Sequence, residues 1–446
     1  MYFYKKNYRN ESISLFNNSI NYPHKNLGFV EICFFSLYII LPKYFAFEFS
    51  SVFPLLTASR IILLLYFIYI LTSRNFCIHK IQIENSILSF FCTILIIDII
   101  HLFYGRLYVL NDIFVLLIEF FLIYFFICIS IDSKEKLEKC LKIIYLSSGV
   151  VALISIIGYF YDTNFFYLLK TTQRDMLMTG NTIIGYRLGN LRIEAGFSHP
   201  IYYGTYICVM IFLGLYFLSI KKTFMSFFCL LLNIIALFIC SSRGCILAFL
   251  CTLVYTVIFN KQMRFIIKYL LFLIIPFLVL FFLFDKVNEY FFSVLYSILI
   301  YFGIFEDNSL VNYGANMDFL HDRWQQLSGI KWTMMNSPFI GFGPSSHSYG
   351  LVSFYNGEWY KSYTIDVGYI QIICDYGFLG FVVFFFLFFS VFLRRNIQNN
   401  LEYIMFKNVF IVYYLCLLSS SMQSKLFCVL FSLFAAFCKI TSKKSE

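Results

Sequence analysis

The sequence predicts an all-α integral membrane protein with about twelve transmembrane helices. Sixty per cent of its 446 residues are hydrophobic and only 13% are charged, and the mean hydropathy is +0.78. A soluble domain of this size exposes far more charge. Apolar runs recur along the chain, and basic residues concentrate in alternate gaps between them. These observations exclude a soluble globular class and predict a multi-pass bundle.

Most predicted spans are apolar runs near the length of about 20 residues that a bilayer requires, and several are shorter or carry a charge. A further apolar run, 291–305, has only 15 residues. We interpret it as an interfacial or re-entrant helix, with a lengthened ninth helix as the alternative. No small-residue cleavage site follows the first run, so we expect no removable signal peptide. The twelve predicted spans lie near 28–46, 55–72, 87–104, 112–131, 141–161, 200–219, 224–240, 245–259, 265–284, 367–391, 404–420 and 426–438.

The distribution of basic residues predicts that both termini are cytoplasmic. With that orientation, 18 lysines and arginines fall in cytoplasmic segments, whereas the short outer loops hold only Lys43, Arg106, Arg243 and Lys425. The net charge of +10 is then a signal of orientation and requires no nucleic-acid partner. The chain divides into a nine-helix bundle with an outer loop at 162–199, a large extracytoplasmic loop before the tenth helix, and a three-helix segment, with boundaries at 1–284, 285–366 and 367–446.

The fourteen cysteines predict neither disulfides nor a metal site. None of them lies in either long outer loop, and no C-x-x-C pair occurs. The chain has only six histidines. Cysteine therefore serves here as a small apolar residue, and we expect no structural zinc and no cofactor.

Four polar residues fall within the outer halves of predicted spans. They are Arg60, Asp98, His101 and Glu119. Charge in hydrocarbon is costly and tends to face a cavity or a partner. One interpretation is a cavity open to the outside. The alternative is that Arg60 extends to the membrane surface while the two acids pair locally.

The first outer loop ends with basic and acidic residues next to a helix start. Arg187, Arg192 and Glu194 precede His199 and Pro200, which opens the sixth predicted span. The free N–H groups and positive dipole of a helix N-terminus, with nearby arginines, suit an anionic ligand. The alternative is that the arginines face lipid headgroups and Pro200 is an ordinary first-turn proline.

A second arginine site follows in the turn between the seventh and eighth spans. Arg243, between Ser242 and Gly244, stands at a helix N-terminus, where its charge opposes the dipole. A bound anion would relieve that conflict. Serine and glycine suit a cap and a tight turn without any further function.

The large outer loop and the tenth span carry the remaining motifs. Arg323 and Trp324 precede a G-x-G turn at Gly341 and Gly343. Taken alone, these residues could be a helix start on the membrane surface and a plain loop. The tenth span opens with Asp366, which could be only an N-cap, and continues with Tyr369, Gly377 and Gly380.

In this order, the motifs resemble the bacterial O-antigen polymerase and O-antigen ligase superfamily, over residues 180–385. That resemblance implies a multi-pass glycosyltransferase of the bacterial inner membrane that acts on an undecaprenyl-diphosphate-linked glycan donor and acceptor. A chain-length regulator and a flippase of the same pathway are implied as partners. Ligases of the superfamily typically have histidine and then asparagine where this chain has Asp366 and Val367, and polymerases often have aspartate and then asparagine. Asp366 therefore favours a polymerase, and Val367 departs from both patterns.

Roles for the motif residues follow from the chemistry of a lipid-diphosphate leaving group. Arginine forks suit phosphate, so we expect the diphosphate at Arg187, Arg192, Arg243 and Arg323. A general base must reach the acceptor hydroxyl, with Asp366 and Glu194 as candidates ahead of His347 and His199. The glycan is expected to contact Trp324, Gly341, Gly343, His347 and Tyr369.

Two features bear on the reaction class. The sequence has no D-x-D pair, so we expect transfer without a metal. The alternative functions are an O-antigen ligase and a flippase or other transporter of lipid-linked oligosaccharides. A transporter leaves the single long outer loop and the lack of matching halves unexplained.

Overall fold

The computed structural model describes residues 27–48, 55–72, 84–172, 186–187, 190–260, 292, 318–361, 363–394, 400–422 and 424–442. These residues form a helical bundle with three small antiparallel hairpins. The hairpins are β1 (Ala46–Phe47) with β2 (Leu56–Thr57), β3 (Tyr186–Arg187) with β4 (Asn190–Leu191), and β5 (Ser353–Asn356) with β6 (Glu358–Lys361). The helices are α2 (Phe29–Leu37), α3 (Ala58–Thr72), α4 (Asn85–Phe103), α5 (Val109–Val115), η2 (Leu116–Leu122), α6 (Ile123–Ser130), α7 (Lys134–Phe160), η3 (Phe165–Leu169), α9 (Pro200–Ile220), α10 (Phe224–Ile239), α11 (Arg243–Phe259), α14 (Asp318–Asn336), η7 (Ser346–Tyr349), α15 (Gly368–Phe392), α16 (Leu401–Cys416) and α17 (Ser424–Ser442).

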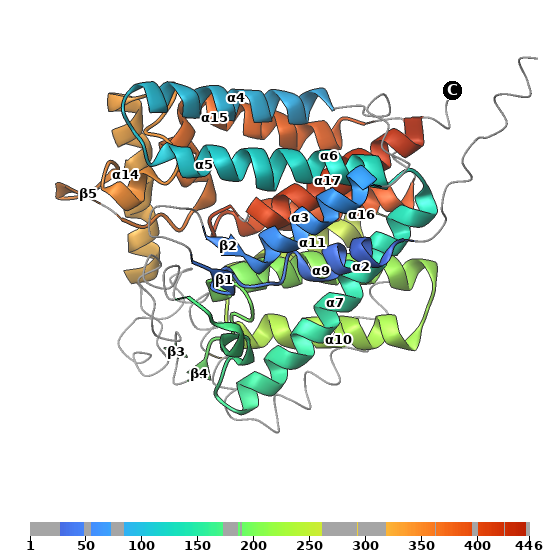
Figure 1. The fold of residues 1–446 in the computed structure, drawn as a ribbon. Helices are drawn as coiled ribbons and strands as arrows, with labels where there is room; N and C mark the ends of the chain where they lie inside the picture. Colours follow the sequence, from blue (N-terminus) through green and yellow to red (C-terminus); the bar gives the residue numbers. More distant parts are fainter. Residues whose placement is uncertain are drawn as a thin grey trace, which may run out of the picture.

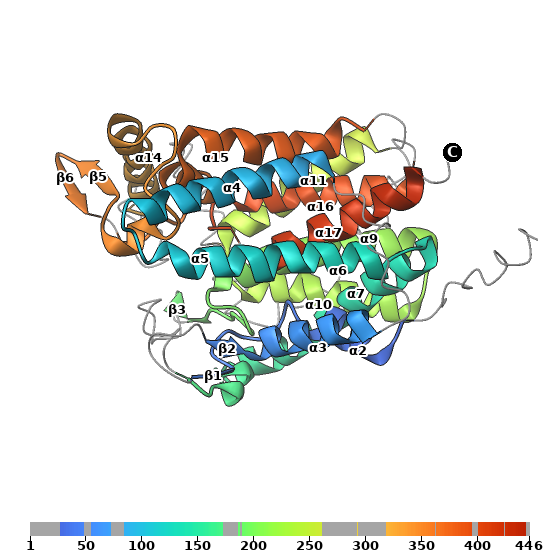
Figure 2. The ribbon, with the colours of Figure 1, turned by 45° about the horizontal axis from the view of Figure 1, so that its top comes forward.

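The long helices run roughly side by side in both views (Figures 1 and 2). All three hairpins and α14 lie at one end of the bundle, which we call the loop end. By length and composition, six of the described helical stretches can cross a bilayer: Asn85–Phe103, Val109–Ser130, Lys134–Phe160, Pro200–Ile220, Gly368–Phe392 and Ser424–Ser442. An all-α membrane protein is therefore confirmed.

The predicted spans match the helices less well near the N-terminus. The first prediction, a continuous span at 28–46, is wrong, because α2 ends at Leu37 and the chain then turns into β1. Nine helical residues cover only about 14 Å, and Pro42 disfavours a longer helix because it lacks an amide hydrogen. The ninth predicted span, 265–284, lies outside the described residues. The total of twelve spans and their orientation stay predictions.

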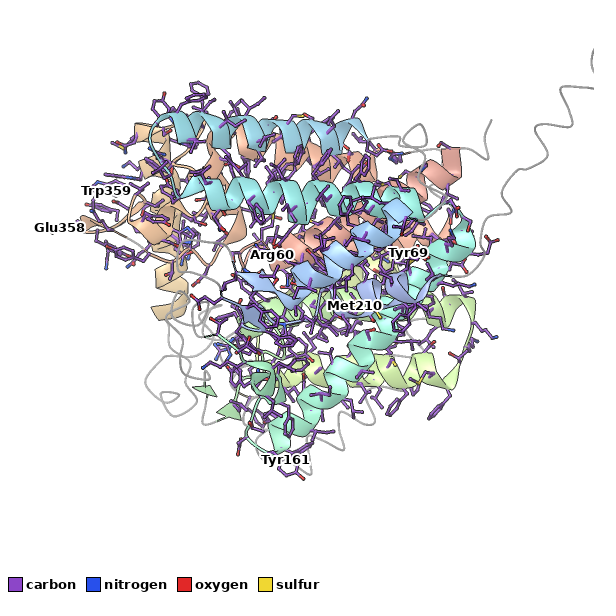
Figure 3. All side chains as sticks on the ribbon, in the orientation of Figure 1. Arg60, Tyr69, Tyr161, Met210, Glu358 and Trp359 are labelled. Atoms are coloured by element: carbon purple, nitrogen blue, oxygen red, sulfur yellow. The ribbon has the colours of Figure 1, made fainter. Side chains whose placement is uncertain are left out.

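The centre of the bundle is α9. Nearly all of its side chains are buried, and Met210 lies in the interior (Figure 3). A helix that is apolar on every side must be surrounded by other elements. Helices α7, α10, α11 and α16 pack around it. The start of α9 therefore opens at the loop end among several neighbouring helices.

A π-helical segment interrupts the stretch from α5 to α6 and carries an internal charge. Glu119 lies within η2 and is buried. Arg60 donates from Nε to the Glu119 carboxylate at 2.7 Å, and it also bonds the carbonyl of Leu55 at 2.6 Å. A buried carboxylate requires such a partner. Arg60 and Glu119 thus pair with each other near the start of α3.

Helix α15 is broken at Gly377, whose φ of 64° and ψ of −161° are not helical. The segment 338–343 fills the break. The amide groups of Phe342 and Gly343 donate to the carbonyls of Cys374 and Asp375 at 2.9 and 2.8 Å. Beyond the break, the amides of Phe378 and Leu379 donate to Pro338 and Phe339 at 2.8 and 3.1 Å. The loop thus supplies hydrogen bonds that the interrupted helix lacks.

We predict that Gly377→Ala lowers the stability of the protein by at least about 2 kcal/mol, because this backbone conformation costs other residues roughly 1–3 kcal/mol. A Cβ at Gly377 would also collide with the backbone of Phe339. Gly357, at the hairpin tip, has a φ of 81° and open space around it, so Gly357→Ala is the matched control. Thermal unfolding in detergent compares the two. Equal losses would mean that the contact with Phe339 contributes nothing.

Candidate functional site

The starts of α9, α11, α15 and α17 meet at the loop end around the turn at residues 417–422. The amide of Gly368, the first residue of α15, donates to the carbonyls of Leu417 and Ser420 at 2.9 and 3.0 Å. Gly244, in the first turn of α11, packs so closely on Ser419 that a Cβ would collide with its side chain. Tyr202, in the first turn of α9, shares a hydroxyl hydrogen bond with Ser421. We call this meeting point the helix-start junction.

The geometry of the helix-start junction gives it a positive electrostatic potential. A helix N-terminus carries unpaired amide groups and the positive end of the helix dipole. Four such ends converge here, and Arg243 is the first residue of one of them. Arg192 lies close by, since its charge acts on the imidazole of His199 at the start of α9. The arrangement favours a bound anion.

His199 is the N-cap of α9, and Pro200 follows it in the first turn. Its Nδ1 accepts a hydrogen bond from the amide of Ile201 at 3.1 Å. Burial lowers the pKa of His199 to about 4, and the charge of Arg192 adds to the effect while that of Asp366 opposes it. The imidazole is therefore neutral near pH 7. Because Nδ1 caps the helix, Nε2 bears the proton and can serve only as a donor.

Glu194 lies in the loop before α9 and is held by neighbouring loops. The hydroxyl of Tyr167 donates to its carboxylate at 2.5 Å, and Asn164 donates to the adjacent Ala195 carbonyl at 2.9 Å. Burial raises the pKa of Glu194, although the Tyr167 bond and the nearby Arg192 charge oppose the shift. Sequence reasoning named Glu194 beside Asp366 as a candidate base, and the structure gives Glu194 a half-buried, hydrogen-bonded position.

Asp366 has the opposite environment, because its side chain is exposed at the mouth of α15. The backbone amides of Asp366 and Val367 donate hydrogen bonds to Oε1 of Gln326 in α14, at 3.1 and 3.4 Å. The N-cap of α15 is Val367, and no side chain caps the helix. The alternative that Asp366 is only an N-cap is therefore wrong. No hydrogen bond or ion pair to its carboxylate occurs within the described residues.

Several residues that were predicted to contact the glycan also make contacts within the protein. Gly341 and Gly343 form the segment docked on the break in α15, and a Cβ at Gly341 would lie 2.6 Å from the Asp375 carbonyl. The hydroxyl of Tyr369 donates to the carbonyl of Tyr414 at 2.7 Å. His347 lies in η7, and burial lowers its pKa.

Three further predicted residues lie in β3 and α14. Arg187 is in β3 and Arg323 is in α14, but their side chains fall outside the described set. Trp324 is 64% exposed on α14. The structure places Arg192 and Asp366 near His199, with Glu194 beside Arg192, and Arg243 opens α11 at the helix-start junction.

Sequence reasoning missed residues that assemble the junction. The serine run 419–421 supplies contacts to three helix starts, and Gln326 holds the backbone before α15. Three consecutive serines between two apolar runs were visible in the sequence and could have been singled out. Gln326 carried no such signal, because one glutamine in a polar loop is not distinctive.

A carboxyl cluster lies under the docked loop, away from the junction. The hydroxyl of Ser346 donates to Asp375 at 2.8 Å. Asp98 is only 1% exposed, and no donor among the described residues reaches either of its carboxylate oxygens. His101 and Arg106 bond the carbonyls of Ile340 and Phe342. Of the two acids predicted to pair locally, Glu119 does so and Asp98 does not.

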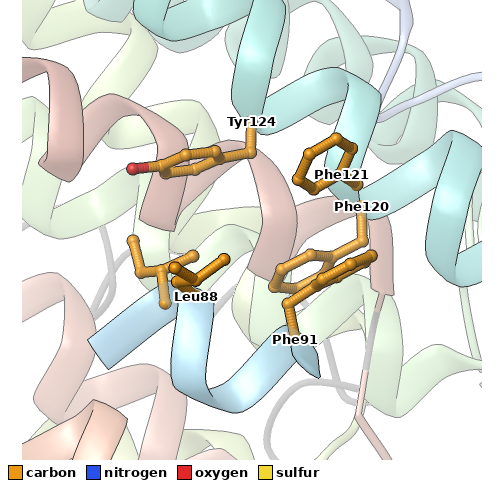
Figure 4. Close-up of a pocket in the computed structure, with 6 residues that line it drawn as sticks. Leu88, Phe91, Phe120, Phe121 and Tyr124 are labelled. Carbon is orange, nitrogen blue, oxygen red and sulfur yellow. The ribbon is translucent and has the colours of Figure 1, made fainter. Parts of the chain in front are cut away.

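One surface groove is apolar and involves none of the junction residues. It is a shallow hollow between α4 and the η2–α6 stretch (Figure 4). Its lining is Ile87, Leu88, Phe91, Phe120, Phe121 and Tyr124. Within the described ranges, no group of three or more histidine, cysteine, aspartate or glutamate side chains is placed to hold a metal ion.

A family model described as O-antigen ligase matches residues 227–385. The matched range includes Arg243, the docked loop, Asp366 and the break in α15, and it ends within α15. It does not reach Arg192 or Glu194. No curated protein matches the chain. The match confirms the resemblance to the O-antigen polymerase and ligase superfamily and indicates handling of lipid-linked glycans.

Proposed function

We propose that the protein is a polymerase that joins undecaprenyl-diphosphate-linked repeat units into a surface polysaccharide, such as O-antigen, capsule or another exopolysaccharide. Transfer takes place at the extracytoplasmic face of the inner membrane. The observation that carries the proposal is the helix-start junction, where four helix N-termini meet beside Arg192 and Arg243. The family match supports the glycan class.

The donor diphosphate binds at the junction. Its negative charge increases as the bond to the sugar breaks, so donors that are already in position stabilise the transition state more than the ground state. Helix-start amides and arginine forks provide such donors. His199 adds an Nε2–H beside Arg192. In this proposal these groups neutralise the leaving group without a metal, in keeping with the absence of a D-x-D pair from the sequence.

Asp366 activates the acceptor. Its carboxylate takes the proton of an acceptor hydroxyl as that oxygen forms a bond to the anomeric carbon of the donor. The bond from the anomeric carbon to the phosphate oxygen breaks, and its electron pair leaves with the diphosphate. Exposure of Asp366 and the lack of a bonded partner for its carboxylate among the described residues suit this role. Glu194 suits it less, because it is half-buried and its carboxylate accepts the Tyr167 hydroxyl.

The polymerase would work with other components of its pathway. A flippase would supply the lipid-linked units, and a chain-length regulator would set how many are joined. An O-antigen ligase function is the second candidate, favoured by the description of the matching family model. A ligase would use the same donor site but a lipid acceptor.

A deletion strain distinguishes the functions by the glycan that remains. Loss of a polymerase leaves single repeat units on the final carrier. Loss of a ligase strands long polymer on undecaprenyl diphosphate, and loss of a flippase leaves no repeats outside the membrane. We expect the first result, read as chain length on a gel and as the lipid to which the glycan is attached. Either of the others would contradict the polymerase assignment.

Complementation of that strain tests Asp366. We predict that Asp366→Asn and Asp366→Ala both lower the rate of transfer by on the order of 10²-fold or more, because neither side chain can accept the proton. Asp162→Asn is the control, since Asp162 is exposed and its φ of 50° is a conformation that asparagine tolerates. Normal chain length with Asp366→Asn would exclude Asp366 as the base.

The diphosphate site is tested with charge-conserving variants. We predict that Arg192→Lys and Arg243→Lys each lower transfer roughly 10-fold or more, because lysine keeps the charge but lacks the two-pronged donor. Arg394→Lys is the control, since Arg394 pairs with Glu84 at the opposite end of the bundle. Full activity of both variants at normal expression would remove these arginines from the diphosphate site.

A further inference from the structure

Helix α14 has one exposed stripe that is largely apolar. The exposed side chains recur at spacings of three and four residues, and on a helix of about 100° per residue they cover an arc of roughly 100°. Trp324 is 64% exposed and Met335 is 66% exposed. Among the described side chains of α14, the stripe comprises Trp324, Leu327, Lys331, Met334 and Met335, and one further exposed residue, Asn336 at the end of the helix, lies outside the arc.

The opposite face of α14 is fixed to the protein. Gln326, Gly329 and Thr333 are buried there, and Gly329 packs on Phe354 of β5 and Cys374 of α15. The hydroxyl of Ser328 accepts the amide of Tyr355 at 2.7 Å. These contacts determine which side of α14 faces outward, so the apolar stripe is a fixed feature of the surface.

Helix α14 lies crosswise to the membrane-spanning helices. Figure 1 shows it at the loop end, nearly perpendicular to α4 and α15, with the β5–β6 hairpin on its far side from the bundle. A helix perpendicular to the spanning helices at the end of the bundle runs along the plane of the membrane surface. That orientation is typical of an interfacial helix.

The stripe continues into the lipid-facing side of α15. Phe339, just beyond α14, is 63% exposed. Its carbonyl accepts the amide of Leu379, and the Pro338 carbonyl accepts that of Phe378. From there the exposed apolar residues of the spanning helix are Phe378, Leu379, Val382, Phe386 and Phe389. Lipid that covers this face of α15 therefore reaches the end of α14.

We propose that α14 is seated in the headgroup region of the bilayer, with its apolar stripe inserted toward the acyl chains. Tryptophan, leucine and methionine on one face suit that depth, and the long stem of Lys331 lets its ammonium group reach the headgroups. Leucine and methionine offer no hydrogen bonds to a sugar, which favours lipid over glycan as the occupant. This inference depends on the spanning bundle and not on the catalytic proposal.

Membrane insertion of α14 would set the height of the candidate site. Gln326 on its buried face holds the backbone of Asp366 and Val367. The depth of α14 therefore determines how far Asp366 stands above the bilayer. A lipid-linked substrate has its diphosphate at a fixed depth in the membrane. The depth of α14 would therefore align Asp366 with that substrate.

Tryptophan fluorescence tests the proposal, because the chain has only three tryptophans. One protein keeps Trp324 and carries Trp332→Phe and Trp359→Phe; its matched control keeps Trp359 and carries Trp324→Phe and Trp332→Phe. Trp359 lies near the tip of the β5–β6 hairpin, beyond α14 (Figure 3). Both full-length proteins are reconstituted in phosphatidylcholine vesicles with bromine atoms near the upper acyl chain.

We expect the brominated lipid to quench roughly half of the Trp324 emission, because an interfacial helix places its apolar side chains at the depth of the upper acyl chain. The emission of Trp359 should stay almost unchanged. Aqueous iodide should quench Trp359 more strongly than Trp324. The proposal is overturned if brominated lipid leaves Trp324 as bright as Trp359. Another outcome would also overturn the proposal: lipid does not quench Trp324, but added glycan or a pathway protein protects Trp324 from iodide. That result would identify the glycan or the protein as the occupant of the stripe.

Discussion

The site depends on one constraint, which is that backbone amides at helix starts need partners away from water. At Gly368 these partners are carbonyls of the turn at residues 417–422. The same turn contacts the starts of α9 and α11. Satisfying these groups draws several helix N-termini to one place. Their positive ends then add to the charges of Arg192 and Arg243, so a structural requirement produces a potential that favours an anion.

A second consequence of the same constraint is seen in α15. A helix interrupted within the bundle would leave carbonyl and amide groups unpaired, and the segment 338–343 pairs them. This docking fixes the end of α14. Gln326 of α14 in turn holds the backbone at Asp366. The break in α15, the membrane-surface helix and the candidate base are therefore parts of one connected assembly.

Buried charge is managed differently in different parts of the molecule. Arg60 and Glu119 neutralise each other, whereas Glu194 is half-buried, accepts the Tyr167 hydroxyl and has a raised pKa. Asp366 remains exposed. These environments distinguish the two carboxylates, of which the sequence made Asp366 the first candidate base and Glu194 the second. Their chemical groups are the same, and the difference lies in exposure and hydrogen bonding.

The sequence by itself determined the membrane class, because hydropathy and span length are properties of local composition. It also indicated the resemblance to the O-antigen polymerase and ligase superfamily and the arginines near helix starts, since these are local motifs. It placed the first span wrongly, because Pro42 and a turn outweigh hydropathy there. Tertiary structure alone decided that Gly341 and Gly343 complete a broken helix, that Asp366 is not a cap, and that four helix starts converge. Those facts depend on hydrogen bonds between residues far apart in the chain, which no local pattern records.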